Sequence, residues 1–343
     1  MAIPVHVTGF AQLPQVPRDL EHDETVSVRL VTAAALEQAG LRRDQVDFTC
    51  SGSNDYVMGR PFSFTMAIDG LGAWPPIRES HVEMDGAWAL YEAWVALQHG
   101  DIRTALVYAY GRGSLCDVDQ VHTLELDPYS LAPLGVDPLS LAALQARTLL
   151  DRGESSEQDF AQVVARNRAH ARDNPNAPDS EQLTVNQLLA RPHVRNPLRA
   201  HDAATRTDGA AAIVLQTGGG GPRIRGIAHC IDSHQPGTRD LGACPSARLA
   251  ATAAGGTDGI GVAELHTPYS PQDLILCREL GLGPDVSINP TGGSFAADTP
   301  MVAGLVRIGE AAEAVRSGAD RALAHATAGP CLQQNLVCIL EAE

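Results

Sequence analysis

The sequence contains no lysine, so all 25 basic side chains are arginine. Without a lysine amine the chain cannot form the Schiff base that imine-type aldolases and pyridoxal enzymes require. A phosphate-binding P-loop is excluded for the same reason, because that motif needs a lysine. Any contact to a phosphate group must therefore come from arginine, hydroxyl groups or backbone N–H groups at helix ends.

Several other features are scarce or absent. No apolar run is long enough to cross a membrane, and aromatic residues make up only 4% of the chain. The seven cysteines include no CxxC pair, which predicts reduced thiols and no metal site. The net charge of -16 argues against nucleic acid and anionic membranes as partners. The first residues, MAIPVHVTGF, predict a strand and no targeting segment, so we expect a cytoplasmic protein.

What the chain does contain is a regular alternation of strands and helices. Strands are predicted at 5–10, 46–53, 80–85 and 104–111, with helices at 24–40 and 86–100 between them. This alternation predicts an α/β fold with a mostly parallel sheet and helices on both faces. Residues 112 to about 200 are polar and proline-rich with helical pieces, which predicts an excursion of the chain over the sheet.

The second half of the sequence repeats the first. GDIRTALVYAYG at 100–111 and GADRALAHATAG at 318–329 share Gly-x-x-Arg, a buried strand and a closing glycine. Each follows a strand, a turn and a helix in the same order, which favours internal duplication over chance similarity. The segment TGGGGP at 217–222 predicts a flexible joint. We therefore expect one half at 1–216, including the excursion, and a second half at 217–343.

Four motifs, in this order along the chain, resemble those of the thiolase superfamily. LRAHDAATRTDGAAAIVL at 198–215 is similar to a strand-entry motif of that family, and GVAELHTPYSPQDLILCRELGL at 261–282 to the segment with a catalytic histidine. INPTGGSFAADTPMVAG at 288–304 lies where the family has Asn-Pro-Gly-Gly and then Gly-His-Pro. TAGPCLQQNLVCILE at 327–341 lies where it has its second cysteine. The resemblance spans nearly the whole chain and is strongest to sterol-carrier and lipid-transfer thiolase-like proteins.

The resemblance implies a fold, a substrate and partners. The fold is that of thiolases, in which two duplicated strand–helix halves form a five-layered α-β-α-β-α core with a loop-domain insertion. The implied substrate is an acyl-coenzyme A thioester, with no covalently bound cofactor, and the implied assembly is a homodimer. In the lipid-transfer branch of bacteria that degrade steroids, such chains pair with a small OB-fold, zinc-ribbon protein of the DUF35 type. Some of them act as retro-aldolases on acyl-CoA.

The nucleophile of the family is missing from this sequence. In the family a cysteine lies at a strand-to-helix turn, where the helix dipole and backbone N–H groups lower the pKa of its thiol. Here the turn contains EMDGA at 83–87, and the sequence leaves open which of these residues takes the place of the cysteine. None of them forms a thioester with a useful leaving group. We therefore expect ordinary acyl transfer to be absent.

One of the other three catalytic positions is retained. His266 matches the histidine of the family, and its role is either catalytic or that of a structural partner at a helix start. Thr299 stands where Gly-His-Pro has its base histidine, and Gly329 lies near the position of the second cysteine. We predict Thr299 and Gly329 as substrate-binding positions. Cys331, two residues further on, is predicted to be an inert buried thiol and not a relocated nucleophile.

Two more features add candidate residues. Tyr269 lies three residues after His266 and would either reach the same pocket, in an acid–base role similar to that of related retro-aldolases, or pack in the core. The turn at 289–293 opens a predicted helix, and its N–H groups would hold a carbonyl oxygen. Asn289, Gly292 and Gly293 are accordingly predicted to bind substrate, with a plain helix start as the alternative.

Three ionisable residues precede the helix at 86–100. His81, Glu83 and Asp85 alternate along the predicted strand, so they would point to one face of the sheet. Buried there, they would need partners. A polar network at a subunit interface is favoured, while an acid–base cluster near the pocket and simple exposure remain alternatives. Glu83 and Asp85 are kept as catalytic candidates.

Three functions remain open from the sequence. Retro-aldol cleavage of an acyl-CoA needs a base and a donor for the enolate but no cysteine, and His266, Tyr269 and the turn at Asn289 would supply these roles. A non-catalytic acyl-CoA-binding or scaffold subunit is the alternative, because three catalytic positions are changed. A residual acyltransferase or thiolase would have to use a relocated cysteine, Cys331 or Cys50.

Overall fold

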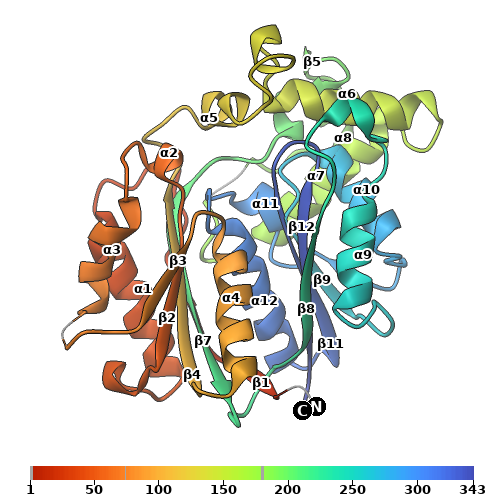
Figure 1. Ribbon diagram of the computed structural model, residues 1–343. Helices are drawn as coiled ribbons and strands as arrows, with labels where there is room; N and C mark the ends of the chain where they lie inside the picture. The colour runs from red at the N-terminus through yellow and green to blue at the C-terminus, as the bar shows by residue number, and fades with distance from the viewer. Residues whose placement is uncertain (1–2, 74, 179–180) are drawn as a thin grey trace.

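The computed structural model describes residues 3–73, 75–178 and 181–343 (Figure 1). In this part of the chain a single ten-stranded sheet has the order β10-β9-β11-β12-β8-β1-β7-β4-β2-β3. The first-half strands are β1 (Val5–Gln12), β2 (Phe48–Gly52), β3 (Glu79–Val82), β4 (Thr104–Arg112) and β7 (Asp208–Thr217). The second-half strands are β8 (Arg223–Ile231), β9 (Val262–Leu265), β10 (Ser287–Ile288), β11 (Arg321–Ala328) and β12 (Gln334–Glu341).

The strand order confirms the predicted duplication. Numbered within its own half, each set of strands has the order third, second, fourth, fifth, first, and the two first strands, β1 and β8, join the halves. The second strand of each half is parallel to both of its neighbours, whereas the fifth is antiparallel to both. The sheet is therefore mixed, and the prediction of a mostly parallel sheet was wrong. The exact limits of the halves stay a prediction.

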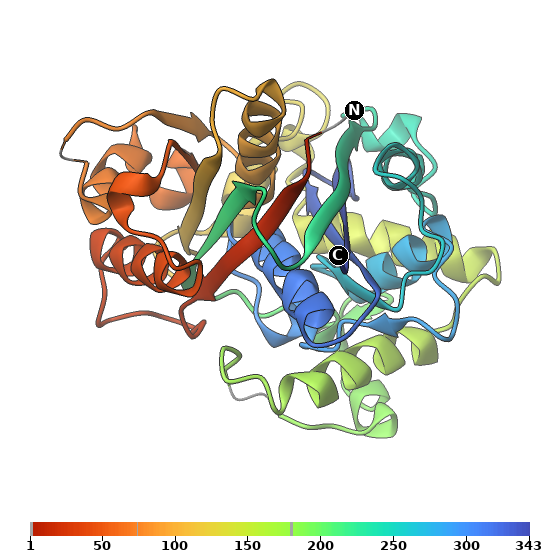
Figure 2. The ribbon, with the colours of Figure 1, turned by 90° about the horizontal axis from the view of Figure 1, so that it is seen from below.

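The two halves of the sheet alternate with layers of helices, so that the molecule has five layers (Figures 1 and 2). In the first half, α1 (Glu24–Gln38) packs on the outer face of β1, β7 and β4, with α3 (Ser63–Leu71) beside it. In the second half, α9 (Pro245–Ala253) packs on β8 and β12, with α10 (Ser270–Glu279) beside it. Between the halves, α4 (Gly86–His99) contacts α12 (Ala303–Arg316). This confirms the predicted α-β-α-β-α arrangement.

Small residues allow the outer helices to approach the sheet closely, at equivalent places in the two halves. A Cβ atom on Gly9 of β1 would lie 2.1 Å from the carbonyl oxygen of Ala35 in α1. A Cβ atom on Gly226 of β8 would lie 2.3 Å from the carbonyl oxygen of Ala254 at the end of α9. Both distances are far below van der Waals contact, so only glycine fits. The abundance of glycine and alanine thus follows from helix-on-sheet packing.

The excursion between β4 and β7 forms a cap on the sheet, at the upper end in Figure 1. It contains α5 (Val118–Leu124), α6 (Pro138–Asp151), α7 (Glu157–Ala171), α8 (Val185–Leu189), β5 (His193–Arg195) and β6 (Leu198–Arg199). The cap lies over the end of the sheet at which α4 follows β3 and α10 follows β9. In an α/β sheet, this is the edge at which ligands bind. Within the described residues, no helix has both the length and the apolar character needed to span a membrane.

Candidate functional site

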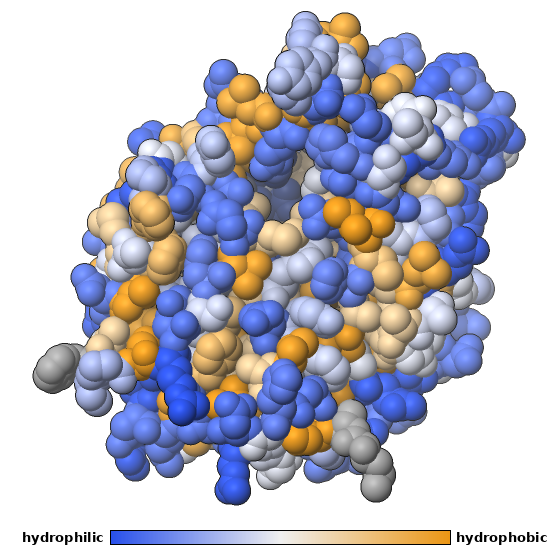
Figure 3. Space-filling model, in the orientation of Figure 1, coloured by the Kyte–Doolittle hydropathy of each residue, from blue (hydrophilic) through white to orange (hydrophobic). Residues whose placement is uncertain are grey.

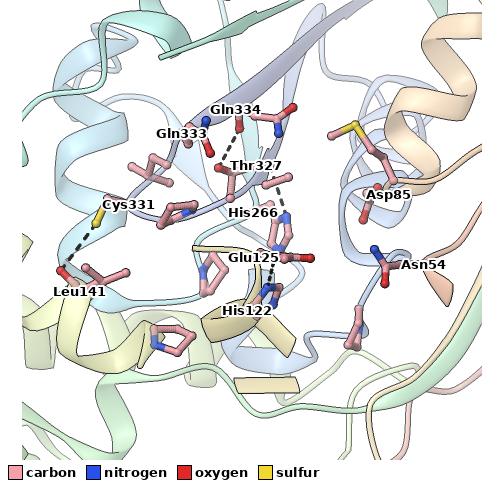
Figure 4. Close-up of a pocket in the computed structure, with 18 of the residues that line it drawn as sticks. Asn54, Asp85, His122, Glu125, Leu141, His266, Thr327, Cys331, Gln333 and Gln334 are labelled. Carbon is pink, nitrogen blue, oxygen red and sulfur yellow. Dashed lines mark hydrogen bonds and ion pairs between the residues drawn. The ribbon is translucent and has the colours of Figure 1, made fainter. Parts of the chain in front are cut away.

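A cavity of about 390 Å³ lies between the excursion and the ends of the strands. It opens as a recess on the face of the molecule shown in Figure 3, and Figure 4 shows residues around it. Its wall includes the turn before α4, helix α5, the first turn of α6, the start of α10 and the turn between β11 and β12. Further residues that line it are Asn54, Arg206, His234, Asp298, Pro300 and Met301. Of the predicted catalytic residues, His266, Tyr269, Asp85 and Glu83 all line this cavity, and so does Gly329.

Asp85 occupies the turn at the start of α4. Its carboxylate accepts the N–H of Ala87 at 2.8 Å, as the N-cap of α4, and the N–H groups of Gly304 and Leu305 at the start of α12, at 3.0 and 3.1 Å. Two helix N-termini therefore converge on one buried carboxylate, which suits an anion. Burial raises the pKa of Asp85, against the opposing effects of nearby His266 and the three N–H groups. Of the residues at 83–87, Asp85 is the one that caps the helix.

The strand before this turn is shorter than predicted. Because β3 ends at Val82, Glu83 and Asp85 are not in a strand, and the prediction that they share one strand face with His81 was wrong. His81 bonds Ser51 Oγ through Nδ1 at 2.9 Å and lies 3.3 Å from Glu83 Oε2 through Nε2. Glu83 Oε1 accepts the N–H of Asp55 at 2.6 Å. Ser51 is fully buried, so this serine–histidine–glutamate network presents no accessible nucleophile.

Both ring nitrogens of His266 have partners. The N–H of Thr327 points to Nδ1 at 3.4 Å, so Nδ1 carries the lone pair, and Nε2 donates to Oδ1 of Asp298 at 3.0 Å. Burial alone would raise the pKa of Asp298, but the contact with His266 and the charges of Arg206 and Arg307 hold it below its usual value. His266 is thereby fixed in one tautomer and one orientation.

Tyr269 and Arg206 form the neighbouring part of the wall. Burial raises the pKa of the Tyr269 phenol, although the positive charge of Arg206 acts against this. Arg206 lies 3.3 Å from Oδ2 of Asp298 and 3.4 Å from Oδ1 of Asp119 in α5. The phenol therefore stays protonated at neutral pH, and the guanidinium is a permanent cation. Both are hydrogen-bond donors at the edge of the cavity.

The turn between β11 and β12 brings a cysteine to the cavity. Cys331 follows Gly329 by two residues, and both line the wall. The Cys331 side chain is buried, with Sγ 3.8 Å from the carbonyl oxygen of Leu141, as Figure 4 shows. Burial raises the pKa of this thiol to about 12. These features agree with the predicted inert thiol.

Among the described residues, no cluster of acidic, histidine or cysteine side chains is suited to hold a metal ion.

No model of a protein family matches the chain. A curated relative, an acetyl-CoA acetyltransferase of Methanothermobacter thermautotrophicus, is 27% identical over 214 residues. That match covers 54% of this chain and 55% of the relative, so it spans about half the length of each.

Solved structures match over nearly the full length. The Ltp2-ChsH2(DUF35) aldolase has a TM-score of 0.81 at 20% identity, over 99% of this chain and 98% of that chain. Human mitochondrial 3-ketoacyl-CoA thiolase has a TM-score of 0.80 at 15% identity, over 99% of both chains. The chain has the thiolase fold. The resemblance noted in the sequence is thus confirmed at the level of the fold.

Four of the residues predicted to bind substrate do not line the cavity. Asn289 has a φ of 49°, and its Oδ1 accepts the N–H of Leu265 at 2.6 Å. A Cβ atom on Gly292 would lie 2.7 Å from Ala171 of α7, and one on Gly293 would lie 2.6 Å from Asn289. This turn therefore packs the start of α11 (Gly293–Ala296) against the excursion, as expected of a plain helix start. A carbonyl-binding role for it stays a prediction without support from the cavity.

Thr299 is the fourth of these residues. It is fully buried, and its hydroxyl lies 2.7 Å from both Thr207 Oγ1 and Gln15 Oε1. Its two neighbours, Asp298 and Pro300, line the cavity in its place. At the position where the family has its base histidine, the neighbouring residues thus line the cavity, whereas the side chain of Thr299 does not.

Sequence reasoning missed several residues that line the cavity. They are His122, Glu125, Arg206, His234 and Asp298. The i, i+3 spacing of His122 and Glu125 within a helical segment was a usable signal, because residues at that spacing lie on one helix face. Nothing in the sequence indicates that this face of the excursion turns towards the strand ends.

Proposed function

We propose that this chain cleaves a carbon–carbon bond in a β-hydroxyacyl-CoA by a retro-aldol reaction. The observation that carries the proposal is the make-up of the cavity. Side chains suited to proton transfer, His266, Tyr269 and Glu83, surround it beside Asp85 at the helix start. Cys331, which also lines it, has a thiol whose pKa is raised to about 12. Such a site favours proton transfer and not thiolate attack.

The reaction needs no thiolate and no external reactant. A base takes the proton of the β-hydroxyl group, and the electron pair of the Cα–Cβ bond moves into the thioester as an enolate. The β-carbon leaves as a ketone or an aldehyde. The proton then goes to Cα and gives the shortened acyl-CoA, so that atoms and electrons balance. Donors aimed at the enolate oxygen stabilise the intermediate.

Tyr269 and Arg206 are the donors that suit the enolate. Since burial raises the pKa of the Tyr269 phenol, this group retains its proton at neutral pH and donates. Arg206 supplies a positive charge beside it. His266 keeps the carboxylate of Asp298 in place, and Asp298 in turn lies within 3.3 Å of Arg206. In this scheme Asp85 holds the starts of α4 and α12, and is itself no nucleophile.

The thioester and the partners rest on similarity. Human mitochondrial 3-ketoacyl-CoA thiolase, also solved in complex with CoA, supports a coenzyme A thioester as substrate. The Ltp2-ChsH2(DUF35) aldolase supports both the reaction type and a DUF35 partner. The absence of a covalently bound cofactor and the OB fold of the partner belong to the proposal through the resemblance noted in the sequence. A homodimer, a role in lipid or steroid side-chain breakdown and a cytoplasmic location are further parts of the proposal.

The test is direct. The purified chain, alone and with a co-expressed DUF35-type protein, is incubated with β-hydroxyacyl-CoA thioesters of increasing chain length and branching. Mass spectrometry then looks for the ketone or aldehyde together with the shortened thioester. Formation of both in equal amounts supports the proposal. If neither forms from any of these thioesters with the partner present, the proposal is wrong.

A non-catalytic role as an acyl-CoA-binding or scaffold subunit is the second candidate. It is favoured by the internal hydrogen bonds that engage Asp85 and His266. The variant His266→Gln separates the two functions when assembly is followed by size-exclusion chromatography. Lost turnover in an intact assembly supports the enzyme. Turnover equal to that of the wild-type assembly would show that His266 is not required, which favours the scaffold role.

A further inference from the structure

Helix α5 of the excursion brings a histidine and a glutamate to the cavity. His122 and Glu125 both line it, and Nδ1 of His122 lies 3.0 Å from Oε2 of Glu125. Figure 4 shows the pair joined by a dashed line. The side chains are 30% and 42% exposed, so they are partly covered by the cavity wall yet open to a ligand. Neither belongs to the motifs that link the sequence to thiolases.

Hydrogen-bond chemistry fixes the tautomer of His122. A carboxylate only accepts hydrogen bonds, so Nδ1 of His122 must carry the proton that points to Glu125. The lone pair is then on Nε2, which has no protein partner among the described residues. The arrangement is the opposite of that at His266, where Thr327 N–H occupies the lone pair on Nδ1 and Asp298 occupies the N–H. Of these two histidines of the cavity, His122 has the free basic nitrogen.

The position of α5 is tied to the rest of the site. Asp117 caps the helix by accepting the N–H of Gln120 at 3.0 Å. In the first turn of α5, Asp119 lies 3.4 Å from Arg206, which also contacts Asp298 at 3.3 Å. Helix α5 therefore carries both the His122–Glu125 pair and Asp119, which contacts Arg206. This contact ties the helix that carries the base to one of the donors proposed for the enolate.

We propose that His122 is the general base of the reaction and that Glu125 is its positioning residue. This inference rests on the retro-aldol function proposed above. Nε2 of His122 takes the proton of the β-hydroxyl group while the Cα–Cβ bond breaks. The resulting imidazolium is stabilised by the Glu125 carboxylate, and it gives the proton to Cα of the enolate. No further reactant is needed, and His122 returns to its neutral form.

The chain contains a matched control for this pair. His193 and Glu157, also in the excursion, form a histidine–glutamate contact of 3.0 Å between Nε2 and Oε2, with exposed fractions of 33% and 35%. Neither residue lines the cavity. The two pairs therefore have similar distances and exposure but different positions. Replacing each histidine by alanine separates a role in the cavity from a general effect on the excursion.

The experiment measures cleavage of a β-hydroxyacyl-CoA by the full assembly. His122→Ala is expected to lower kcat by about 10²- to 10⁴-fold with KM little changed, and added imidazole should restore part of the rate. His193→Ala should retain the wild-type rate. His122→Gln, which keeps a side chain of similar size, serves as a second variant if His122→Ala fails to fold. Activity of His122→Ala or His122→Gln within about threefold of wild type would overturn the inference and leave the retro-aldol function standing.

Glu125 is tested as a positioning residue. Glu125→Gln should lower kcat by about tenfold or more with KM unchanged, because the imidazolium loses its counter-charge. Glu125→Asp, which keeps the charge, should recover part of the loss, and imidazole should not rescue Glu125→Gln. Equal rates in the two variants would contradict the positioning role. Complete inactivity of the wild-type assembly on every β-hydroxyacyl-CoA would instead remove the proposed function, and this inference with it.

Discussion

The two walls of the cavity differ in how their polar atoms are used. The sheet-side wall, formed by Asp85, His266 and Asp298, is buried, and every functional group in it accepts or donates internal hydrogen bonds. The excursion wall, formed by His122 and Glu125, is partly exposed and makes one bond between its two members. On the sheet-side wall, His266 and Asp298 lie in the segments at 261–282 and 288–304 that resemble thiolase motifs, whereas Asp85 lies in none of the four segments. The excursion wall lies in the loop insertion.

This difference separates polar groups that hold the fold together from polar groups that are free to contact a ligand. On the sheet-side wall, a carboxylate at the N-termini of α4 and α12 satisfies the backbone groups that would otherwise bind an anion. The Asp85 carboxylate thereby stabilises the starts of both helices. The excursion wall has few internal bonds to lose, so its side chains remain free to act on a ligand. We expect substitutions on the sheet side to reduce stability, and substitutions on the excursion wall to reduce activity.

The largest effect is expected from an ion pair behind the sheet-side wall. Arg307 of α12 lies 2.8 Å from Glu264 of β9, and the two side chains are 3% and 0% exposed. Arg307→Met would leave the Glu264 carboxylate buried without a counter-charge, and we expect the free energy of unfolding to fall by about 3–5 kcal/mol. Chemical unfolding measures this. Arg147→Met in α6, which breaks an exposed pair with Asp151, should lower the free energy of unfolding far less. Equal losses for both variants would contradict the comparison.

The next effect concerns the two aspartates that cap α4 and α5. Asp85→Ala removes the acceptor of three buried N–H groups, so we expect a loss of about 2–4 kcal/mol in unfolding free energy. Asp117→Ala removes one capping bond from a short, exposed helix and should cost about 0.5–1 kcal/mol. Thermal or urea unfolding of both variants gives the two values. An Asp85→Ala protein as stable as wild type would show that the convergence of helix N-termini contributes nothing.

A smaller effect should appear in the pH dependence of stability, with opposite signs for two aspartates of the same wall. The pKa of Asp298 is held below its usual value, so its ionised form stabilises the fold at neutral pH, and this stabilisation is lost as the pH falls below about 4. The pKa of Asp85 is raised by burial, so ionisation costs stability at neutral pH, and that cost disappears on acidification towards pH ~4. A difference of one between the pKa values of a group in the folded and unfolded states changes the free energy of unfolding by about 1.4 kcal/mol.

Unfolding of wild type, Asp298→Asn and Asp85→Asn between pH 7 and 3.5 tests both signs. The advantage of wild type over Asp298→Asn should shrink in acid. The stability of wild type relative to Asp85→Asn should rise as the pH falls towards 4. If the free energy of unfolding varied with pH in the same way for all three proteins, neither carboxyl would have a different pKa in the folded and unfolded states. That result would contradict the shifted pKa values of Asp298 and Asp85.

The sequence predicted the fold and part of the sheet-side wall, for physical reasons. Alternating strands and helices, a repeated Gly-x-x-Arg strand and ordered motifs are local signals, and they identified the layers, His266 and the missing cysteine. The extent of β3 was not predictable, because the capping bonds of Asp85 to Gly304 and Leu305 join residues more than 200 positions apart. The excursion wall was missed for a similar reason. Which face of α5 turns inward is decided by tertiary packing and not by its own sequence.

The last prediction is that Cys331 and Cys50 are not acylated. Burial raises the pKa of both Cys331 and Cys50 to about 12, so that fewer than about one thiol in 10⁴ is ionised at pH 7.5. Exposure of the wild-type protein to a saturated acyl-CoA should therefore leave its intact mass unchanged. Asp85→Cys is the matched positive control, because the N–H groups of Ala87, Gly304 and Leu305 would favour a thiolate at that position. An acyl adduct on Cys331 in the wild-type protein would contradict this prediction and show that the cavity supports thiol chemistry. An adduct confined to Asp85→Cys would show that the start of α4 lowers the pKa of a thiol placed there.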